Sequence, residues 1–445
     1  MNFKLEMVPL AVFAYCFIRG LRDARWLFLL VLAASSFPVS IGSTIATPYK
    51  VALLVALTGY GVRALTSGRL AAPHPTLTAV ILLTLLSRVL FLAAWEESLF
   101  SLAGPIGALL CILICSQAVK SAEDLVPFGH VLVILTLTAL GMVVQELSHV
   151  SLSGKSIVRA DGPHGDPNSS AVYATCNAVL ALPWISQLGA LWRWTLGILL
   201  AGAVVGIIFY TNSRGATVAI AVAGLSLAVV AAAGWRARFL LVGGFAVLTL
   251  VAAMLAPASY VNRQLGTFST DVSGREVIED SMRGDLNRIG LRMMTEAPVV
   301  GHGTPAFRAT AARELGTATD LHNAWLYAVV AQGLPIGSLY LLIHLLAMAW
   351  SLRVAARSKG LERVAAAAVF ANLLMLLIFY STNPSSWHPA HFICLGIAAQ
   401  LYRAHRRPTS DAASKADATA PQPMAARSLA YGAGTRSTGV QPEVS

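Results

Sequence analysis

The stretch of sequence that decides the fold runs from residue 191 to residue 234 and reads LWRWTLGILLAGAVVGIIFYTNSRGATVAIAVAGLSLAVVAAAG. Two apolar runs, 191–211 and 216–234, flank the polar motif Ser213-Arg214-Gly215. An α-helix needs about 20 apolar residues to cross the hydrocarbon layer of a bilayer. A strand of a membrane β-barrel would alternate apolar and polar residues instead. The stretch therefore predicts two membrane-spanning helices joined by a tight polar turn.

The same pattern extends over the rest of the chain, which has 445 residues, 56% of them hydrophobic and 12% charged, with a mean hydropathy of +0.67. Soluble domains carry about 25% charged residues. We predict an all-α, polytopic membrane protein with about twelve transmembrane helices, at residues 24–42, 48–66, 76–94, 99–119, 125–147, 169–188, 191–211, 216–234, 237–256, 324–350, 363–382 and 388–403. The earlier apolar run 7–18 is short for a span. It is predicted to be an interfacial or re-entrant segment, with a thirteenth span as the alternative.

The positions of Lys and Arg predict the orientation of the spans, because cytoplasmic connections are enriched in both. We place the connection that holds Arg19, Arg22 and Arg25 in the cytoplasm. Strict alternation then brings most other basic residues to the same side: Arg63, Arg69, Lys120, Arg193, Arg236, Arg238, Arg353, Arg357, Lys359, Arg363, Arg403, Arg406 and Arg407. Topology accounts for the net charge of +11, so nucleic-acid binding is not predicted.

The predicted organisation has five parts. They are N-terminal transmembrane helices over 1–147, transmembrane helices over 148–256 with an outer loop at 148–168, a large outer loop over 257–321, C-terminal transmembrane helices over 322–407, and a tail over 408–445. The tail is rich in Ala, Ser, Thr, Pro and Gly and has almost no large apolar residues. Such a composition cannot bury enough surface to order itself, so we expect a disordered cytoplasmic tail.

Three apolar helices on the outer side begin directly after polar motifs. The motifs are the segment from Arg159 to Asn168 and Ser169, the triplet Ser213-Arg214-Gly215, and Asp320-Leu321-His322-Asn323. A helix N-terminus presents unpaired N–H groups and a partial positive charge, and it binds anions, phosphate above all. Capping alone is the alternative, since short polar side chains suit N-cap positions: Asn168 or Ser169, Ser213, and Asp320 or Asn323.

Capping does not explain Arg214, because a cation at the positive end of a helix is unfavourable unless an anion is bound there too. Its guanidinium can hold a phosphate with two hydrogen bonds, and Gly215 permits close approach of the backbone. The alternative is an arginine that reaches to the headgroup layer of the membrane. The motif thus predicts a phosphate-binding helix start.

His322 is placed similarly, just before an apolar helix. A helix N-terminus disfavours imidazolium, which keeps the ring neutral and able to accept a proton. A bound diphosphate would act in the opposite direction. The alternative is an interfacial or capping histidine.

The 257–321 segment contains an amphipathic stretch. Leu286, Ile289, Met293 and Met294 recur at helical spacing, and Arg288 and Arg292 share another face. A helix over the outer surface fits this pattern. The following Gly301-His302-Gly303 turn lacks the Lys and the strand-turn-helix context of a phosphate-binding P-loop, so it does not support nucleotide binding.

No metal or cofactor site is predicted. Cys111 and Cys115 share a helical face without a His or carboxylate partner nearby, and thiols in apolar runs mostly act as small hydrophobes. His388 and His391 could suit a metal, but no third ligand is evident. The alternatives for this pair are an acceptor cleft and the membrane interface.

Taken in order, several motifs resemble those of the O-antigen ligase and O-antigen polymerase superfamily over roughly residues 150–350. They are Asp166-Pro167-Asn168, Ser213-Arg214-Gly215, Arg288 with Met293 and Met294, Glu296 to Gly303 with Phe307, His322-Asn323-Ala-Trp325-Leu326, and Gln332 to Gly337. The sequence departs from the usual pattern at Gly290, Leu291 and Pro335.

The resemblance implies an all-helical type C glycosyltransferase fold in a bacterial inner membrane, with a periplasmic active site. It implies transfer of a glycan from undecaprenyl diphosphate to an acceptor sugar, on lipid A–core or a growing polysaccharide, with inversion and without a metal. By the same resemblance Arg214, Arg288 and His322 would be catalytic. We expect Arg159, Asn168, Ser213, Gly215 and Asn323 to contact substrate.

Three alternatives stay open. A transporter of a polar or lipid-linked solute would have ionisable residues within its spans, and Arg88 is the clearest candidate. Among enzymes, the acceptor could be a protein hydroxyl rather than a sugar. Ligation to lipid A–core and polymerisation of repeat units share the donor chemistry and differ only in the acceptor.

Overall fold

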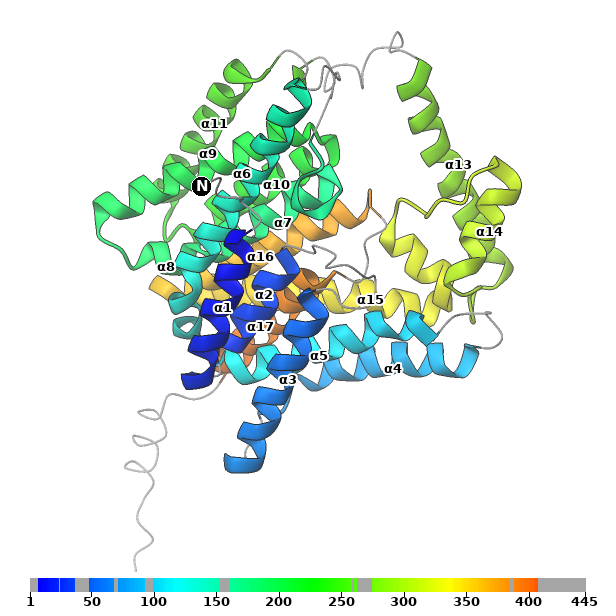
Figure 1. The fold of residues 1–445 in the computed structure, drawn as a ribbon, viewed down its shortest axis with the longest axis horizontal. Coiled ribbons are helices and arrows are strands. Elements are labelled where there is room, and N and C mark those ends of the chain that lie inside the picture. Colours follow the sequence, from blue (N-terminus) through cyan, green and yellow to red (C-terminus); the bar gives the residue numbers. More distant parts are fainter. Residues whose placement is uncertain are drawn as a thin grey trace, which may run out of the picture. The chain divides into compact units, whose positions relative to one another are not determined.

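The computed structural model describes residues 7–23, 25–36, 48–67, 71–92, 99–152, 160–257, 260–261, 274–383 and 388–406. Within these ranges the chain is helical and contains no strand (Figure 1). The prediction of an all-α membrane protein is confirmed in this coarse form. The predicted tail, 408–445, lies outside the described residues.

Every predicted apolar segment coincides with at least one helix. The α-helices are α1 Met7–Arg22, α2 Arg25–Ser36, α3 Pro48–Ser67, α4 Pro75–Phe91, α5 Ala103–Ala118, α6 Gly129–Leu152, α7 Pro167–Leu180, α8 Leu182–Ser186, α9 Ala190–Thr211, α10 Arg214–Ala231, α11 Trp235–Leu255, α13 Gly274–Glu296, α14 Thr304–Leu315, α15 Ala324–Arg357, α16 Gly360–Tyr380 and α17 Pro389–Arg406. Three short 3₁₀ helices join them, η1 Leu99–Leu102, η2 Ala122–Phe128 and η3 Gly162–His164. The segment 7–18 lies within α1, which packs against α2.

Six helical segments of the described chain are long and apolar enough to cross a membrane. They are Ala122–Ser148, Ala190–Thr211, Arg214–Ala231, Trp235–Leu255, Ala324–Arg357 and Gly360–Tyr380. Shorter apolar helices occupy the N-terminal part of the chain. The total of twelve spans therefore stays a prediction.

Helix α15 departs from the prediction of one uninterrupted span over 324–350. Gly333 has a φ of 77°, in the left-handed region, and breaks the helix, and Pro335 lacks a backbone N–H. The two halves fold back beside each other, because a Cβ built on Gly337 would lie 2.5 Å from the Cα of Val329. The run therefore contains a half-helix, 324–332, followed by a separate long helix.

The predicted span 169–188 is also divided, into α7 and α8 at Ala181. Pro183 lies in the first turn of α8 and cannot donate to the carbonyl four residues earlier. The apolar run is continuous in sequence, whereas the helix is not.

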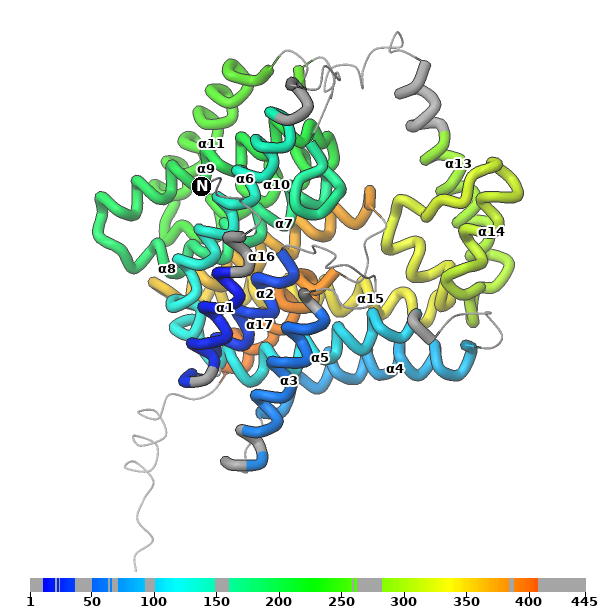
Figure 2. Tube along the Cα trace, in the orientation of Figure 1, coloured from blue at the N-terminus to red at the C-terminus, as the bar shows by residue number. Residues whose placement is uncertain are grey.

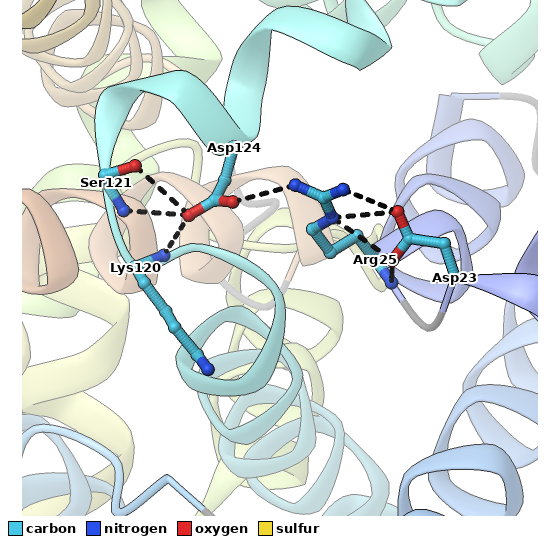
Figure 3. A network of polar contacts seen from close by, with 5 residues as sticks. All are labelled: Asp23, Arg25, Lys120, Ser121 and Asp124. Atoms are coloured by element: carbon cyan, nitrogen blue, oxygen red, sulfur yellow. Dashed lines mark hydrogen bonds and ion pairs between the residues drawn. The ribbon is translucent and has the colours of Figure 1, made fainter. Parts of the chain in front are cut away.

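One end of the bundle gathers connections rich in basic residues, and we call it the basic end. Arg25 contacts Asp23 and, 3.0 Å away, the carboxylate of Asp124, which also accepts from the backbone of Lys120 and Ser121 (Figure 3). Three further bonds join connections on this end: Ala71 to Gln117, Arg403 to Ala72, and Arg363 to Ala232. All of them join connections that were predicted to share one side.

The opposite end gathers the polar motifs, and we call it the motif end. The Ala160 N–H donates to the Tyr210 carbonyl at 3.0 Å, and the Trp325 indole donates to the Leu377 carbonyl at 3.2 Å. Each of these contacts joins segments that were predicted to lie on the same side. Which end faces the periplasm stays a prediction.

Segments far apart in sequence form the main core. Helix α4 runs alongside α15, and the cyan segment η2 packs against α16 (Figure 2). Gly396 of α17 lies so close to Cys115 of α5 that an added Cβ would meet the thiol at 2.8 Å. The N-terminal helices therefore help to position the C-terminal ones.

A second, smaller core joins α13, α14 and the first half of α15. It consists of the buried side chains Leu286, Ile289, Met293, Phe307, Ala311, Leu321 and Val330, with Met294 packed against them. The amphipathic face predicted in the outer loop is confirmed. This small core ties the loop to the half-helix that begins after His322.

Candidate functional site

The start of α10 is held by two polar side chains. The Ser213 hydroxyl accepts from the Ala216 N–H at 3.1 Å, as an N-cap, and it donates to the amide oxygen of Asn168 in a short hydrogen bond. Asn212 adopts a left-handed conformation with φ 48°, which ends α9 and turns the chain. Arg214 is thus the first residue of α10 and is partly exposed at the motif end. The predicted cap by Ser213 is confirmed.

The start of α7 is capped by a residue other than the predicted ones. The Asp166 carboxylate accepts from the Ser169 N–H at 2.8 Å, so neither Asn168 nor Ser169 is the N-cap. Pro167 occupies the first helical position, where proline is favoured, so the cap is Asp166, two residues before Asn168. Asn168 is instead free to bridge α7 and α10 through Ser213.

Glu146 fixes the turn before α7. Its carboxylate accepts from the backbone N–H of Asp161 at 3.1 Å and of Gly162 at 2.9 Å. Gly162 has a φ of 67°, which only glycine adopts readily. Sequence reasoning missed Glu146, because it lies near the end of an apolar run and its backbone partners are distant in sequence.

Gly215 permits close packing of α10 against the end of α16. A Cβ at this position would lie 3.0 Å from the Thr382 hydroxyl. The space in front of Gly215 is therefore occupied by Thr382. The predicted approach of a phosphate to Gly215 stays a prediction.

The start of α15 carries the second candidate group. The Asn323 side chain accepts from the N–H of Trp325 at 3.1 Å and of Leu326 at 3.0 Å, so Asn323 is the N-cap. His322 directly precedes this cap and is partly exposed. Asp320 is not a cap, because its carboxylate forms a two-pronged ion pair with Arg308.

Both helix starts contact the C-terminal end of α16 and the residues that follow it. Trp325, three residues after His322, bonds to the Leu377 carbonyl, and Gly215 packs on Thr382. The motifs that contain Asn168, Ser213, Arg214 and Gly215 therefore share this place with His322 and Asn323. We call this group the candidate site.

Arg288 points elsewhere in the structure. Its side chain is 82% exposed and pairs with Asp285, one turn earlier on α13, at 2.6 Å. The neighbouring Gly290 packs against Leu321, next to His322, so Arg288 lies on a helix that reaches the candidate site but on its solvent-facing side. Arg159 lies outside the described residues.

A junction of two glycine-containing loops supports the half-helix of α15. The N–H groups of His302 and Gly303 donate to the carbonyls of Val330 and Ala331 at 2.9 and 3.0 Å. A Cβ on Gly333 would lie 2.1 Å from the Val299 oxygen. The Gly-His-Gly turn thus has a structural role, since it satisfies carbonyls that the break at Gly333 leaves without helical partners.

Arg88 lies beside the same break and is 3% exposed. With the Gln332 amide oxygen facing it, Nε and Nη2 donate to that oxygen at 2.9 and 3.2 Å, and Nη1 donates to the Ser101 carbonyl at 2.9 Å. Arg88 thus binds α15 where the helix is interrupted. The buried charge of Arg88 therefore has a structural role. This role differs from the one that the transporter alternative would give it.

A group of aromatic and imidazole rings lies at the motif end, next to the start of α7. Tyr173 and His388 stack with centroids 3.4 Å apart, and His164 lies 5.5 Å from His388. Burial lowers the pKa of His164 to about 4, although the Asp166 carboxylate and a hydrogen bond to the Ser36 carbonyl oppose the shift. His164 is therefore uncharged near neutral pH and adds no positive charge to the candidate site.

An apolar cavity of about 360 Å³ lies between α7, α9, α10 and α11. Its polar part includes Thr217 and Tyr260, whose hydroxyls lie 3.0 Å apart, and Thr217 also donates to the Ser213 carbonyl. The cavity thus begins one helical turn after Arg214 and continues between apolar helices. A cationic helix start and an apolar cavity share the helix α10.

Comparison with known proteins supports the resemblance noted in the sequence. No curated protein is significantly similar to the chain. Residues 197–341, about a third of the chain, match the O-antigen ligase family. The match includes Arg214, Arg288 and His322, and it covers the cavity-lining helices α9 to α11 and the break in α15. The resemblance to the O-antigen ligase and polymerase superfamily is confirmed over residues 197–341, which match the O-antigen ligase family.

Proposed function

We propose that the protein is a glycosyltransferase of the bacterial inner membrane that moves a glycan from undecaprenyl diphosphate to the hydroxyl of an acceptor sugar at the periplasmic face. The reaction inverts the anomeric centre and needs no metal. The acceptor is lipid A–core in a ligase or the growing polysaccharide in a polymerase. A protein hydroxyl is the other acceptor that the same donor chemistry would serve.

The observation that carries this proposal is the position of Arg214 at the start of α10, one turn from the apolar cavity. A polyprenyl diphosphate has a doubly charged head and a long apolar tail. A helix N-terminus with an arginine suits the head, and a cavity lined by membrane-embedded helices suits the tail.

The chemical step is a single displacement. The acceptor hydroxyl attacks the anomeric carbon and gives its proton to the His322 imidazole. The bond between that carbon and the diphosphate oxygen breaks, and its electron pair leaves with the diphosphate. Arg214 and the N–H groups of the first turn of α10 stabilise the negative charge that develops there, and Arg288 joins them from α13 when the donor is bound.

The general base and the electrostatic stabilisation of the leaving group contribute to the rate to different extents. A general base accelerates such a reaction typically 10²–10⁴-fold. A preorganised donor that stabilises developing charge contributes about 3–4 kcal/mol. The general base can therefore contribute up to about tenfold more to the rate than one preorganised donor.

The test is glycan transfer by the purified protein in lipid vesicles, with a synthetic polyprenyl-diphosphate glycan as donor. We expect Arg214→Ala to lower kcat/KM roughly 10²–10³-fold. Arg214→Lys is also poor, since an ammonium cannot form the two-pronged contact. The matched control is Arg193→Ala at the other end of α9, where the side chain bonds to a backbone carbonyl, and it keeps full activity. Full activity of Arg214→Ala would refute the proposal.

Activity in EDTA tests the metal-free scheme. We expect the same rate with and without the chelator. A loss that Mg²⁺ or Mn²⁺ restores would overturn this part of the proposal.

The acceptor is identified by offering lipid A–core, a repeat unit and a protein hydroxyl to the same preparation.

A further inference from the structure

Three buried side chains behind the candidate site form a continuous hydrogen-bond chain. The Tyr340 hydroxyl lies 2.8 Å from Nδ1 of His391, Nε2 of His391 lies 2.7 Å from Nδ1 of His344, and Nε2 of His344 lies 2.8 Å from the Leu373 carbonyl. Both imidazoles are completely buried. The chain joins the long part of α15 to α16 and α17.

The chain has one fixed direction when both rings are neutral. A carbonyl only accepts, so Nε2 of His344 carries the hydrogen and Nδ1 accepts. Nε2 of His391 must then donate, and its Nδ1 accepts from Tyr340. The far end is a backbone carbonyl that cannot pass a proton on. The chain therefore orients groups and does not conduct protons across the membrane.

The same side chains surround Trp325. Its ring packs at 5.2–6.2 Å, between centroids, from those of Tyr340, His344, His391 and Tyr380. Trp325 belongs to the half-helix 324–332, whereas its neighbours belong to the other half of α15 and to α16 and α17. The ring cluster thus anchors the beginning of the half-helix.

This anchor matters because the half-helix is cut off at Gly333. A continuous helix would fix the direction of its first turn through its own backbone. Here the far end is held by the loop at His302 and Gly303, and the near end by Trp325. His322 lies three residues before Trp325 and takes its position from this near end.

We infer that Tyr340, His391 and His344 are positioning residues for His322, acting through Trp325. The inference rests on the proposed function for the role of His322, while the placement itself stands on the contacts above. Loss of the chain would let Trp325 shift, and a shift of about 1 Å at a catalytic group can cost 10²-fold in rate.

The test compares His391→Gln with His391→Leu. Gln has both a donor and an acceptor and can replace the two bonds of His391, whereas Leu has a similar volume and neither. We expect His391→Leu to lower kcat roughly ten- to hundredfold with little change in the KM for the donor, and His391→Gln to retain several-fold more activity. Tyr340→Phe, which removes only one hydroxyl, should behave like the Leu variant. If His391 contributed only packing and no hydrogen bonds, Leu would be tolerated at least as well as Gln. That result would overturn the inference.

A second measurement does not depend on activity. In a His322→Cys background, a membrane-impermeant maleimide labels the new thiol, since the five native cysteines are buried. We expect the labelling rate to change in the presence of His391→Leu and to stay the same with His391→Gln. Equal rates in both would overturn the inference. If the wild type fails to transfer glycan while the labelling rates differ as expected, the proposed function fails and the positioning role survives.

Discussion

The two helix starts of the candidate site resemble each other in sequence but are held differently. At α10, Ser213 caps a continuous helix of 18 residues, and Asn168 secures the cap from α7. At α15, Asn323 caps a half-helix that ends at Gly333. The direction of α10, and with it the position of Arg214, follows from the helix itself. The position of His322 depends on contacts at both ends of a short segment.

This difference explains why one region gathers so many supporting residues. The half-helix is contacted by the Gly301–Gly303 turn, by Arg88 through Gln332, and by the rings around Trp325. Most of these residues lie in separate stretches of the chain. We expect substitutions far from α15 to affect His322, whereas few positions outside α7 and α16 should affect Arg214.

The largest effect is expected for His322 itself. His322→Ala removes the proposed base and should lower kcat about 10²–10⁴-fold, with a smaller change in the KM for the donor. Arg214→Ala should change both parameters, since in the proposed mechanism Arg214 contacts the diphosphate before and during the reaction. The control is His405→Ala at the basic end, where the ring lies near Glu362. Transfer by His322→Ala at the wild-type rate would remove the base from the scheme.

The next largest effect is expected for a substitution at Gly333, where α15 is interrupted. In Gly333→Ala the methyl group would meet the Val299 oxygen at 2.1 Å, so the junction cannot form unchanged. We expect a lower melting temperature and a loss of activity of roughly 10²-fold through displacement of the half-helix. Gly316→Ala is the matched control: its φ of 70° is similar, but its surroundings are open.

The control separates the cost of the backbone conformation from the cost of the clash with Val299. At Gly316, with φ 70° and ψ 9°, the left-handed backbone costs an alanine roughly 1–2 kcal/mol, whereas Gly333, with φ 77° and ψ 165°, lies in a region that is essentially restricted to glycine. Only Gly333 adds the clash with Val299. Equal activity of the two variants would show that the junction does not position His322.

A smaller effect is expected for Arg288. Its side chain faces solvent and pairs with Asp285, so it can reach the donor only after α13 or the side chain reorients. We expect Arg288→Ala to lower kcat/KM about tenfold, which is less than a preorganised donor would cost. Arg292→Ala on the same helix, paired with Glu314, should change it less than twofold. Equal rates for both variants would exclude Arg288 as a donor ligand.

Much of the fold was predictable because a membrane span leaves a simple signature, about 20 apolar residues. The caps by Ser213 and Asn323 followed from local chemistry. The cap by Asp166 could also have been found, since Pro167 marks the first helical position. These features depend on a few neighbouring residues.

The rest depends on contacts between distant residues. The break at Gly333 forms where a loop 30 residues earlier docks its N–H groups on Val330 and Ala331. His344 lies in an apolar run like a residue packed against lipid, and only the fold brings it to His391. The exposure of Arg288 likewise reflects which face of α13 packs against α15. Local pattern predicted the helices, and tertiary packing decided which side chains meet.

The smallest effect is expected for His164. It lies beside α7, the helix whose Asn168 secures the start of α10 and so Arg214. Its pKa is lowered from 6.5 to about 4, mainly by burial. Between these values the unfolded chain binds a proton that the folded chain does not, so acidification favours unfolding. Stability from this group is fully present above about pH 6.5 and is lost as the pH falls towards 4. His164→Asn should therefore reduce the fall in melting temperature between pH 7 and pH 4, while Arg193→Ala should leave it unchanged. A wild-type slope in His164→Asn would mean that the imidazole is solvated in the folded protein, and the packing of His164 against Tyr173 and His388 would then be wrong.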